Sequence, residues 1–189
     1  MAISDTLKTF LQASRVKYTA MKHPVVYTAQ EIAAAQHVPG RQLAKSVLVI
    51  TDRGPVLAVL PAIHLIDLKK LKALLRAKTL SIGKEADIKA NFPDVEVGAM
   101  SPFGNLYHVP VAVDKELGLS EEIVFNAGSH TDTIKMRYKD FVAAVKPKVG
   151  AFGQPIARPS KPAKAKKKPA VKTKSKKASR PRAKTRSRR

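Results

Sequence analysis

The chain has 189 residues and a formal net charge of +22 at pH 7, and this charge is unevenly distributed. Residues 158–189 contain 16 lysines and arginines and no acidic residue, whereas residues 1–157 contain 20 basic and 14 acidic residues, a net charge of +6. About 157 residues suffice for one domain with a sizeable core. The sequence therefore predicts one mildly basic domain followed by a strongly basic tail.

The composition excludes several classes of protein. The chain has no cysteine, so it has no disulfide framework, thiol nucleophile or cysteine-ligated metal. No apolar run is long enough to span a membrane, and residues 1–10 do not have the pattern of a secretory signal. Tryptophan is absent and aromatic residues make up 5% of the chain, which argues against an aromatic platform for stacking bases. We expect a cytoplasmic protein.

Capping residues and apolar periodicity predict the elements of the first half. Ser4 can cap a first helix, residues 16–22 alternate as a strand, and Thr28 opens a second helix through a capping box. The apolar run 46–50, the turn at 52–54 and the run 56–60 predict a hairpin of two strands. Asp67 can cap a third helix, with a buried stripe made of Leu68, Leu71, Leu74 and Leu75.

The second half continues with short strands and helices. We expect a helix at 85–91, a final helix at 138–145, and strands at 95–97, 106–113, 122–125 and 133–137. Because the elements interleave without a repeating βα unit, we expect an α+β fold with a mixed, curved sheet flanked by helices. The predicted domain covers residues 1–150. Residues 151–189 are predicted to be a Gly/Pro linker and a disordered basic tail, since they have too few apolar residues to form a core.

Common catalytic signatures are absent, but three segments stand out together. There is no GxSxG, HExxH, P-loop or GxGxxG motif, and the five histidines show no metal-ligand spacing, so we expect neither a metal nor a cofactor. The segments are G40-RQLAKSVLV, with Lys45 at the mouth of a buried strand, G98-AMSPFGN, a GxxxP loop, and F125-NAGSHT, a turn of small residues.

In this order, the three segments resemble those of the YbaK/EbsC-like aminoacyl-tRNA deacylases, which are related to the editing domain of bacterial prolyl-tRNA synthetases. The resemblance covers roughly residues 5–148. It implies a mixed sheet curled into a partly closed, barrel-like form, and hydrolysis of the ester that joins a wrong amino acid to tRNA. It implies catalytic roles for Lys45, Gly98 and Gly128. The substrate-binding residues that it implies are Ala99, Met100, Ser101, Pro102, Ser129 and His130.

These residue types suit ester hydrolysis. An aminoacyl ester is already activated, so the main requirement is to hold the ester and stabilise the oxyanion of the tetrahedral intermediate. Glycines allow backbone N–H groups to approach closely, and one such donor can change the rate by about 10²–10³. A lysine at the pocket rim can hold a phosphate or the ester region as a point charge.

Two hypotheses follow. In the first, the chain removes a small wrong amino acid from tRNA, most plausibly proline tRNA, and the tail adds affinity for RNA. An aminoacyl-tRNA synthetase, DNA or the ribosome are further candidate partners, and no membrane is expected. In the alternative hypothesis, the domain is a non-catalytic scaffold and the protein binds a polyanion such as DNA, rRNA or polyphosphate. The sequence does not identify the amino acid that is removed.

Overall fold

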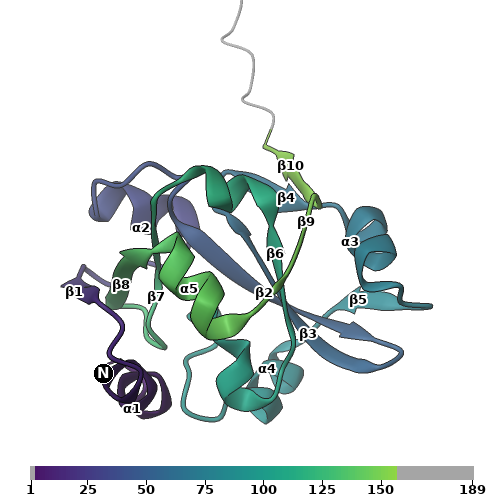
Figure 1. The fold of residues 1–189 in the computed structure, drawn as a ribbon, viewed down its shortest axis with the longest axis horizontal. Coiled ribbons are helices and arrows are strands. Elements are labelled where there is room, and N and C mark those ends of the chain that lie inside the picture. The colour runs from purple at the N-terminus through teal and green to yellow at the C-terminus, as the bar shows by residue number, and fades with distance from the viewer. Residues whose placement is uncertain (1–2, 157–189) are drawn as a thin grey trace, which may run out of the picture. The chain divides into compact units, whose positions relative to one another are not determined.

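In the computed structural model, which describes residues 3–156, ten strands form three sheets (Figure 1). The largest sheet has the strand order β5–β2–β3–β6–β9, with bounds Leu80–Ile82, Ala44–Thr51, Gly54–Pro61, Val111–Asp114 and Lys148–Gly150. β2 and β3 form the predicted antiparallel hairpin, whereas β3–β6 and β6–β9 are parallel pairs. The sheet is therefore mixed, as predicted.

The two smaller sheets are antiparallel. One has the order β1–β8–β7, with bounds Tyr18–Lys22, Asp132–Arg137 and Glu122–Asn126, and the other pairs β4 (His64–Ile66) with β10 (Gly153–Pro155). A parallel bridge between Leu43 and Val124 joins the largest sheet to β7. The sheets form an open arrangement and do not close into a barrel.

Five α-helices flank the sheets of the described chain, with bounds Asp5–Ala13 (α1), Ala29–Ala35 (α2), Leu68–Leu75 (α3), Glu85–Asn91 (α4) and Tyr138–Val145 (α5). Two 3₁₀ helices span Gly104–Tyr107 (η1) and Lys115–Leu119 (η2). Ser4 and Asp67 cap α1 and α3, and Thr28 forms a capping box with Glu31. These helix starts confirm the predictions. None of the helices described is long and apolar enough to cross a membrane.

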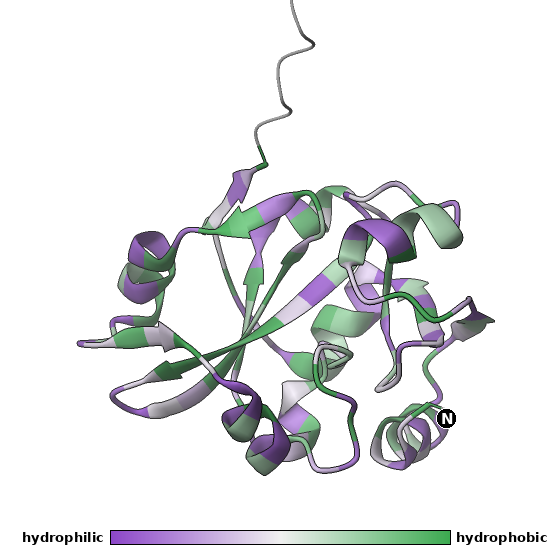
Figure 2. Ribbon diagram, turned by 180° about the vertical axis from the view of Figure 1, so that it is seen from behind, coloured by the Kyte–Doolittle hydropathy of each residue, from purple (hydrophilic) through white to green (hydrophobic). Residues whose placement is uncertain are grey.

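Buried side chains cover both faces of the largest sheet. On one face, α1 and α5 pack over a cluster in which the ring of Phe103 contacts the rings of Phe125 and Phe141. On the other face, Leu71 of α3 and Phe152 pack against the strands. Figure 2 shows hydrophobic residues along the central strands and many hydrophilic residues on α3 and α4. The α+β fold that we predicted is confirmed.

Three details of the prediction were wrong. Residues 95–97 form turns and not a strand, because the backbone of Glu96 bonds to Gly128 and Ala99. In the segment 106–113, the first two residues end the 3₁₀ helix η1, and the strand begins only at Val111. In the predicted stripe of α3, Leu71 is buried but Leu68 is 37% exposed, because the helix is short and contacts the sheet through one turn.

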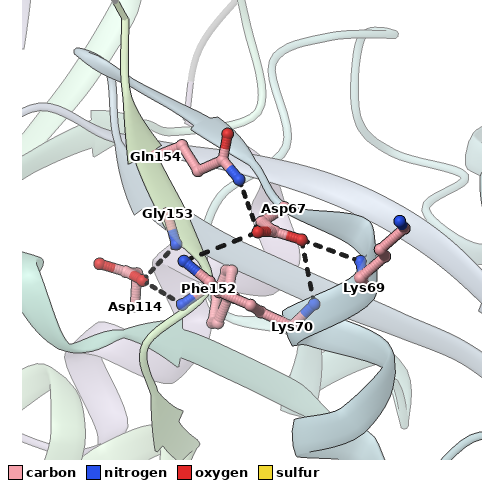
Figure 3. Close-up of polar contacts among 7 residues, drawn as sticks. All are labelled: Asp67, Lys69, Lys70, Asp114, Phe152, Gly153 and Gln154. Carbon is pink, nitrogen blue, oxygen red and sulfur yellow. Dashed lines mark hydrogen bonds and ion pairs between the residues drawn. The ribbon is translucent and has the colours of Figure 1, made fainter.

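The segment 151–156 belongs to the fold, although we predicted a linker there. Phe152 is fully buried, and β10 pairs with β4. The buried carboxylate of Asp114 accepts hydrogen bonds from the N–H groups of Phe152 and Gly153, and Gln154 donates to Asp67 (Figure 3). Few apolar residues were needed because the Asp114 carboxylate fixes the backbone of Phe152 and Gly153, and the Asp67 carboxylate holds the side chain of Gln154. The predicted basic tail, 158–189, lies outside the described residues.

Candidate active site

Lys45 lies at the start of β2, half-buried, where the strand pairs with the end of β3. Its Nζ atom donates a hydrogen bond to the backbone carbonyl of His64. Among residues 3–156, no carboxylate lies within ion-pairing distance of Lys45. Burial disfavours the charged ammonium and lowers the pKa of Lys45. An ammonium group without a counter-ion, partly removed from water, is suited to interact with a negatively charged ligand.

A cavity of about 40 Å³ lies beside Lys45. Four segments meet there: the entry to α2, the start of β2, the loop at 98–100 and the end of β7. Its walls are formed by Tyr27, Ala29, Ile32, Leu43, Ala44, Lys45, Ser46, Gly98, Met100 and Asn126. One water molecule needs roughly 10–15 Å³ of such a cavity, so the cavity has room for a few waters or a small side chain.

Two polar atoms of the cavity residues are buried without a partner. They are Oγ of Ser46 and Oδ1 of Asn126, neither of which makes a hydrogen bond within the described residues. Leaving a buried polar atom unpaired costs about 1–3 kcal/mol, so such atoms are usually paired. Both atoms can accept hydrogen bonds, which suits a ligand that carries N–H donors.

The loop at 98–102 contributes Gly98 and Met100 to the wall of the same cavity. Gly98 is exposed and adopts a left-handed conformation, with φ of 91°, that few other residues tolerate. The N–H groups of Gly98 and Met100 donate to no acceptor among the described residues, whereas that of Ala99 donates to the carbonyl of Glu96 at 2.9 Å. Two residues of the cavity wall therefore have backbone N–H groups that are unpaired within the described residues.

The model of the aminoacyl-tRNA editing domain matches residues 23–144 of the chain. The chain belongs to this family. The matched span contains every residue of the cavity wall. This confirms the resemblance that the three segments had indicated. The predicted tail lies beyond the matched span.

Solved structures share the fold of the editing domain. One is a protein proposed to be a trans-editing enzyme for prolyl-tRNA synthetase; it is 18% identical, with a TM-score of 0.70, and the match covers 81% of this chain and 99% of that one. Another comes from work on grafting epitopes onto scaffold proteins, with 18% identity, a TM-score of 0.74 and coverage of 82% and 99%. Identities this low establish the fold alone. No curated protein matches the chain.

Of the residues predicted in the GxxxP loop of the editing domain, only Gly98 and Met100 line the cavity. Ala99, Ser101 and Pro102 are buried and are not part of the cavity wall. Ala99 instead ties the loop to the neighbouring turn, because its carbonyl accepts from the N–H of Gly128 at 3.1 Å. Ala99, Ser101 and Pro102 therefore pack beneath the cavity wall and do not form part of it.

The predicted turn at 128–130 also lies behind the cavity wall. The N–H of Gly128 is bonded to Ala99, so it is not available as an oxyanion donor in this structure. Ser129 donates to the carboxylate of Asp132 at 2.9 Å. The ring of His130 lies behind Gly98, with Nε2 3.0 Å from the carbonyl oxygen of Val97 and with a buried, unpaired Nδ1. The turn positions the loop at 98–100.

Sequence reasoning missed three polar or aromatic residues of the candidate site, Tyr27, Ser46 and Asn126. Ser46 and Asn126 lie within segments that had been singled out, but neither has a distinctive spacing. Tyr27 is 72% exposed at the cavity, and its ring lies 4.9 Å from that of His130. An exposed tyrosine can stack on a ring of its ligand. Among the described residues, no group of three or more metal-ligating side chains occurs.

Proposed function

We propose that the protein hydrolyses the ester bond of mischarged aminoacyl-tRNA. The observation that carries this proposal is the cavity, which combines the Lys45 ammonium, two available backbone N–H groups and two unpaired acceptor atoms. An aminoacyl ester has matching features: a carbonyl oxygen that becomes an oxyanion, a cationic α-amino group and a nearby phosphate. Membership of the editing family supports the same reaction class.

The cavity volume favours a small aminoacyl group. About 40 Å³ accommodates a methyl or hydroxymethyl group more readily than a branched or aromatic side chain. In the proposed pose the α-ammonium donates to Oγ of Ser46 and Oδ1 of Asn126, which relieves two unpaired acceptors. Alanine is the candidate that we favour, and proline tRNA is the candidate carrier, since one protein of this fold is proposed to edit for prolyl-tRNA synthetase.

The reaction needs no covalent enzyme intermediate. Water attacks the ester carbonyl carbon, the carbonyl oxygen becomes an oxyanion, and the bond to the ribose oxygen then breaks with transfer of a proton to that oxygen. The N–H groups of Gly98 and Met100 would stabilise the oxyanion, and Lys45 would add a positive charge nearby. The neighbouring ribose hydroxyl of the substrate can relay the proton. The products are free amino acid and uncharged tRNA.

We further propose that the basic segment 158–189 adds affinity for tRNA. Sixteen positive charges without an acidic residue favour binding to any polyanion, independently of its sequence. The chain would then act in the cytoplasm, alongside a synthetase that produces the mischarged tRNA. DNA and the ribosome would be competing partners of the same segment.

A panel of aminoacyl-tRNAs tests the proposal. The purified chain is mixed with alanyl-, seryl- and prolyl-tRNA for proline, and release of free amino acid is followed over time. We expect rapid release of alanine and little release of proline. Tight binding of all these RNAs without release of any amino acid would support the alternative hypothesis, a non-catalytic polyanion-binding protein.

A further inference from the structure

We propose that a basic groove between α1, the end of β8 and α5 binds the phosphate backbone of the RNA stem whose 3′ end enters the cavity, an inference that rests on the proposed function. The groove has a volume of about 530 Å³ and does not share a residue with the cavity. Its walls include the end of α1, residues 15–17 before β1, Arg137 at the end of β8 and the first turns of α5. None of these residues takes part in the proposed chemistry.

The groove is strongly positive. Arg15, Lys17, Arg137 and Lys139 are exposed there, and Asp140 is the one acidic residue of its wall. Within residues 3–156 none of these four cations forms an ion pair. By contrast, Lys135, on the neighbouring part of β8, is paired with Glu122 at 2.8 Å. Cations that are left unpaired around a hollow of this size provide a site for an extended anion.

The backbone beneath these cations is fixed. Arg15 follows the C-cap of α1 in a left-handed conformation, with its N–H bonded to Gln12. Arg137 is the N-cap of α5, and the N–H of the next residue, Tyr138, donates to the carbonyl of Glu121 at 2.9 Å. Phe10 contacts the core through Phe103 and provides an apolar floor for the aliphatic stems of the long side chains.

The position of the groove fits an RNA stem. β8 connects the two sites, because His130 precedes the strand beside the cavity and Arg137 ends it (Figure 1). The six residues of β8 span about 20 Å. One strand of a stacked nucleic acid helix has a phosphate about every 3.4 Å, so this distance corresponds to about six nucleotides. An RNA with its 3′ terminus in the cavity would then place the phosphates of its first base pairs at the groove.

Arginine suits phosphate at such a site, since its guanidinium group can bond two phosphate oxygens at once. The described groove also has no large exposed apolar side chain that could anchor a protein partner. RNA backbone is therefore the ligand class that the groove fits best.

The test is an equilibrium binding measurement on the full chain with uncharged RNA. The double variant Arg137→Gln and Lys139→Gln is compared with Lys69→Gln and Lys72→Gln, a control pair that removes the same charge from exposed positions on α3. The two ligands are a short RNA hairpin with a single-stranded CCA end and the single-stranded end alone. Circular dichroism and melting curves check that both variants are folded.

We expect the groove variant to bind the hairpin about tenfold more weakly and to lose about two units of the slope of log K against log salt. Its affinity for the single-stranded end should be that of the control pair. Equal hairpin affinity for the groove variant and the control would overturn the inference, as would an equal loss of affinity for both RNAs. Because the measurement needs no hydrolysis, its outcome is separate from that of the deacylation assay.

Discussion

The ammonium group of Lys45 is held by the backbone carbonyl of His64, the first residue of β4, and β4 is paired with the last strand of the fold. The pairing places Pro155 opposite His64, and the carboxylate of Asp114 fixes the preceding residues Phe152 and Gly153 (Figure 3). The strand that supports the candidate catalytic lysine is therefore secured by a segment that lies more than a hundred residues after Lys45 in the chain.

Asp114→Asn tests this support. The amide replaces a buried carboxylate oxygen that accepts two N–H groups, so we expect a loss of about 2 kcal/mol in the free energy of unfolding. Deacylation should fall as β10 loosens from β4. Denaturant unfolding and single-turnover assays measure the two effects. Glu85→Gln, an exposed acidic residue of α4, is the control and should change neither. A fully stable Asp114→Asn protein would contradict the assigned role of the carboxylate.

Two truncations locate the end of the folded unit. Removal of 158–189 should leave the melting temperature unchanged, whereas removal of 151–189 should lower it, because the shorter chain lacks the buried Phe152 and the partner strand of β4. Thermal melts of the two truncated proteins show whether residues 151–157 contribute to the stability of the fold. Equal melting temperatures would restore the boundary at residue 150 that the sequence had predicted.

The tail should govern affinity for tRNA and not the chemical step. If about half of its 16 charges contact phosphates, it contributes a slope of log K against log salt of about −6 for single-stranded RNA. Removing 158–189 should raise the KM at physiological salt and leave kcat unchanged. Steady-state assays at two salt concentrations test this. An unchanged KM would indicate that the tail binds a partner other than tRNA. A large fall in kcat would indicate that the tail contributes to the active site.

The two glycines of the predicted site should respond differently to alanine. A Cβ at Gly98 would meet only the ring of His130, at 3.5 Å, whereas a Cβ at Gly128 would lie 2.8 Å from Cβ of Ser4, which caps α1. Both positions have positive φ, so both variants carry backbone strain of about 1 kcal/mol or more. We expect Gly98→Ala mainly to lower kcat and Gly128→Ala mainly to lower the melting temperature. The reverse pattern would place the oxyanion donors in the turn at Gly128.

The deacylation rate should fall at alkaline pH as Lys45 loses its proton. Burial lowers the pKa of Lys45 below its ordinary value of 10.5, so the loss begins at a lower pH than for an exposed lysine. The comparison is between the enzyme-catalysed rate, corrected for spontaneous hydrolysis, in the wild type and in Lys45→Arg. The guanidinium stays charged, so the rate of the Lys45→Arg variant should stay constant to higher pH than the wild-type rate does, even if the variant is slower at neutral pH. Identical pH profiles would exclude Lys45 as the titrating group.

The lowered pKa of Lys45 also predicts how the charge of this residue affects the stability of the folded protein. Because the pKa of Lys45 is lower in the folded protein than in the unfolded chain, the charged ammonium opposes folding at neutral pH. This cost begins to fall as the pH rises above the folded-state pKa, and it is gone only above the ordinary value of 10.5. Removing the charge at neutral pH should therefore leave the melting temperature unchanged or raise it.

Local sequence signals were sufficient for the parts of the fold that local contacts determine. Ser4, Thr28 and Asp67 each cap a helix through bonds within three residues, so the starts of α1, α2 and α3 could be predicted. β10 could not, because its position depends on Asp114 and β4, which are distant in sequence.

The candidate site follows the same rule. Lys45 could be placed at a strand entrance because the apolar run of β2 begins beside it. Gly98 lines the cavity, whereas the N–H of Gly128 donates to the carbonyl of Ala99. This difference depends on how the two loops pack against each other. No pattern within either loop distinguishes a residue of the cavity wall from one that supports it.

The central claim is that Lys45 and its cavity promote hydrolysis of a mischarged aminoacyl-tRNA. The most direct measurement is single-turnover release of alanine from alanyl-tRNA for proline by the wild type, by Lys45→Met and by Lys69→Met as the control on an exposed helix face. Methionine keeps the aliphatic stem and removes the charge. We predict a loss of about 10²-fold for Lys45→Met with no loss of melting temperature, and wild-type release by the control. Release of alanine by Lys45→Met at the wild-type rate would contradict the account.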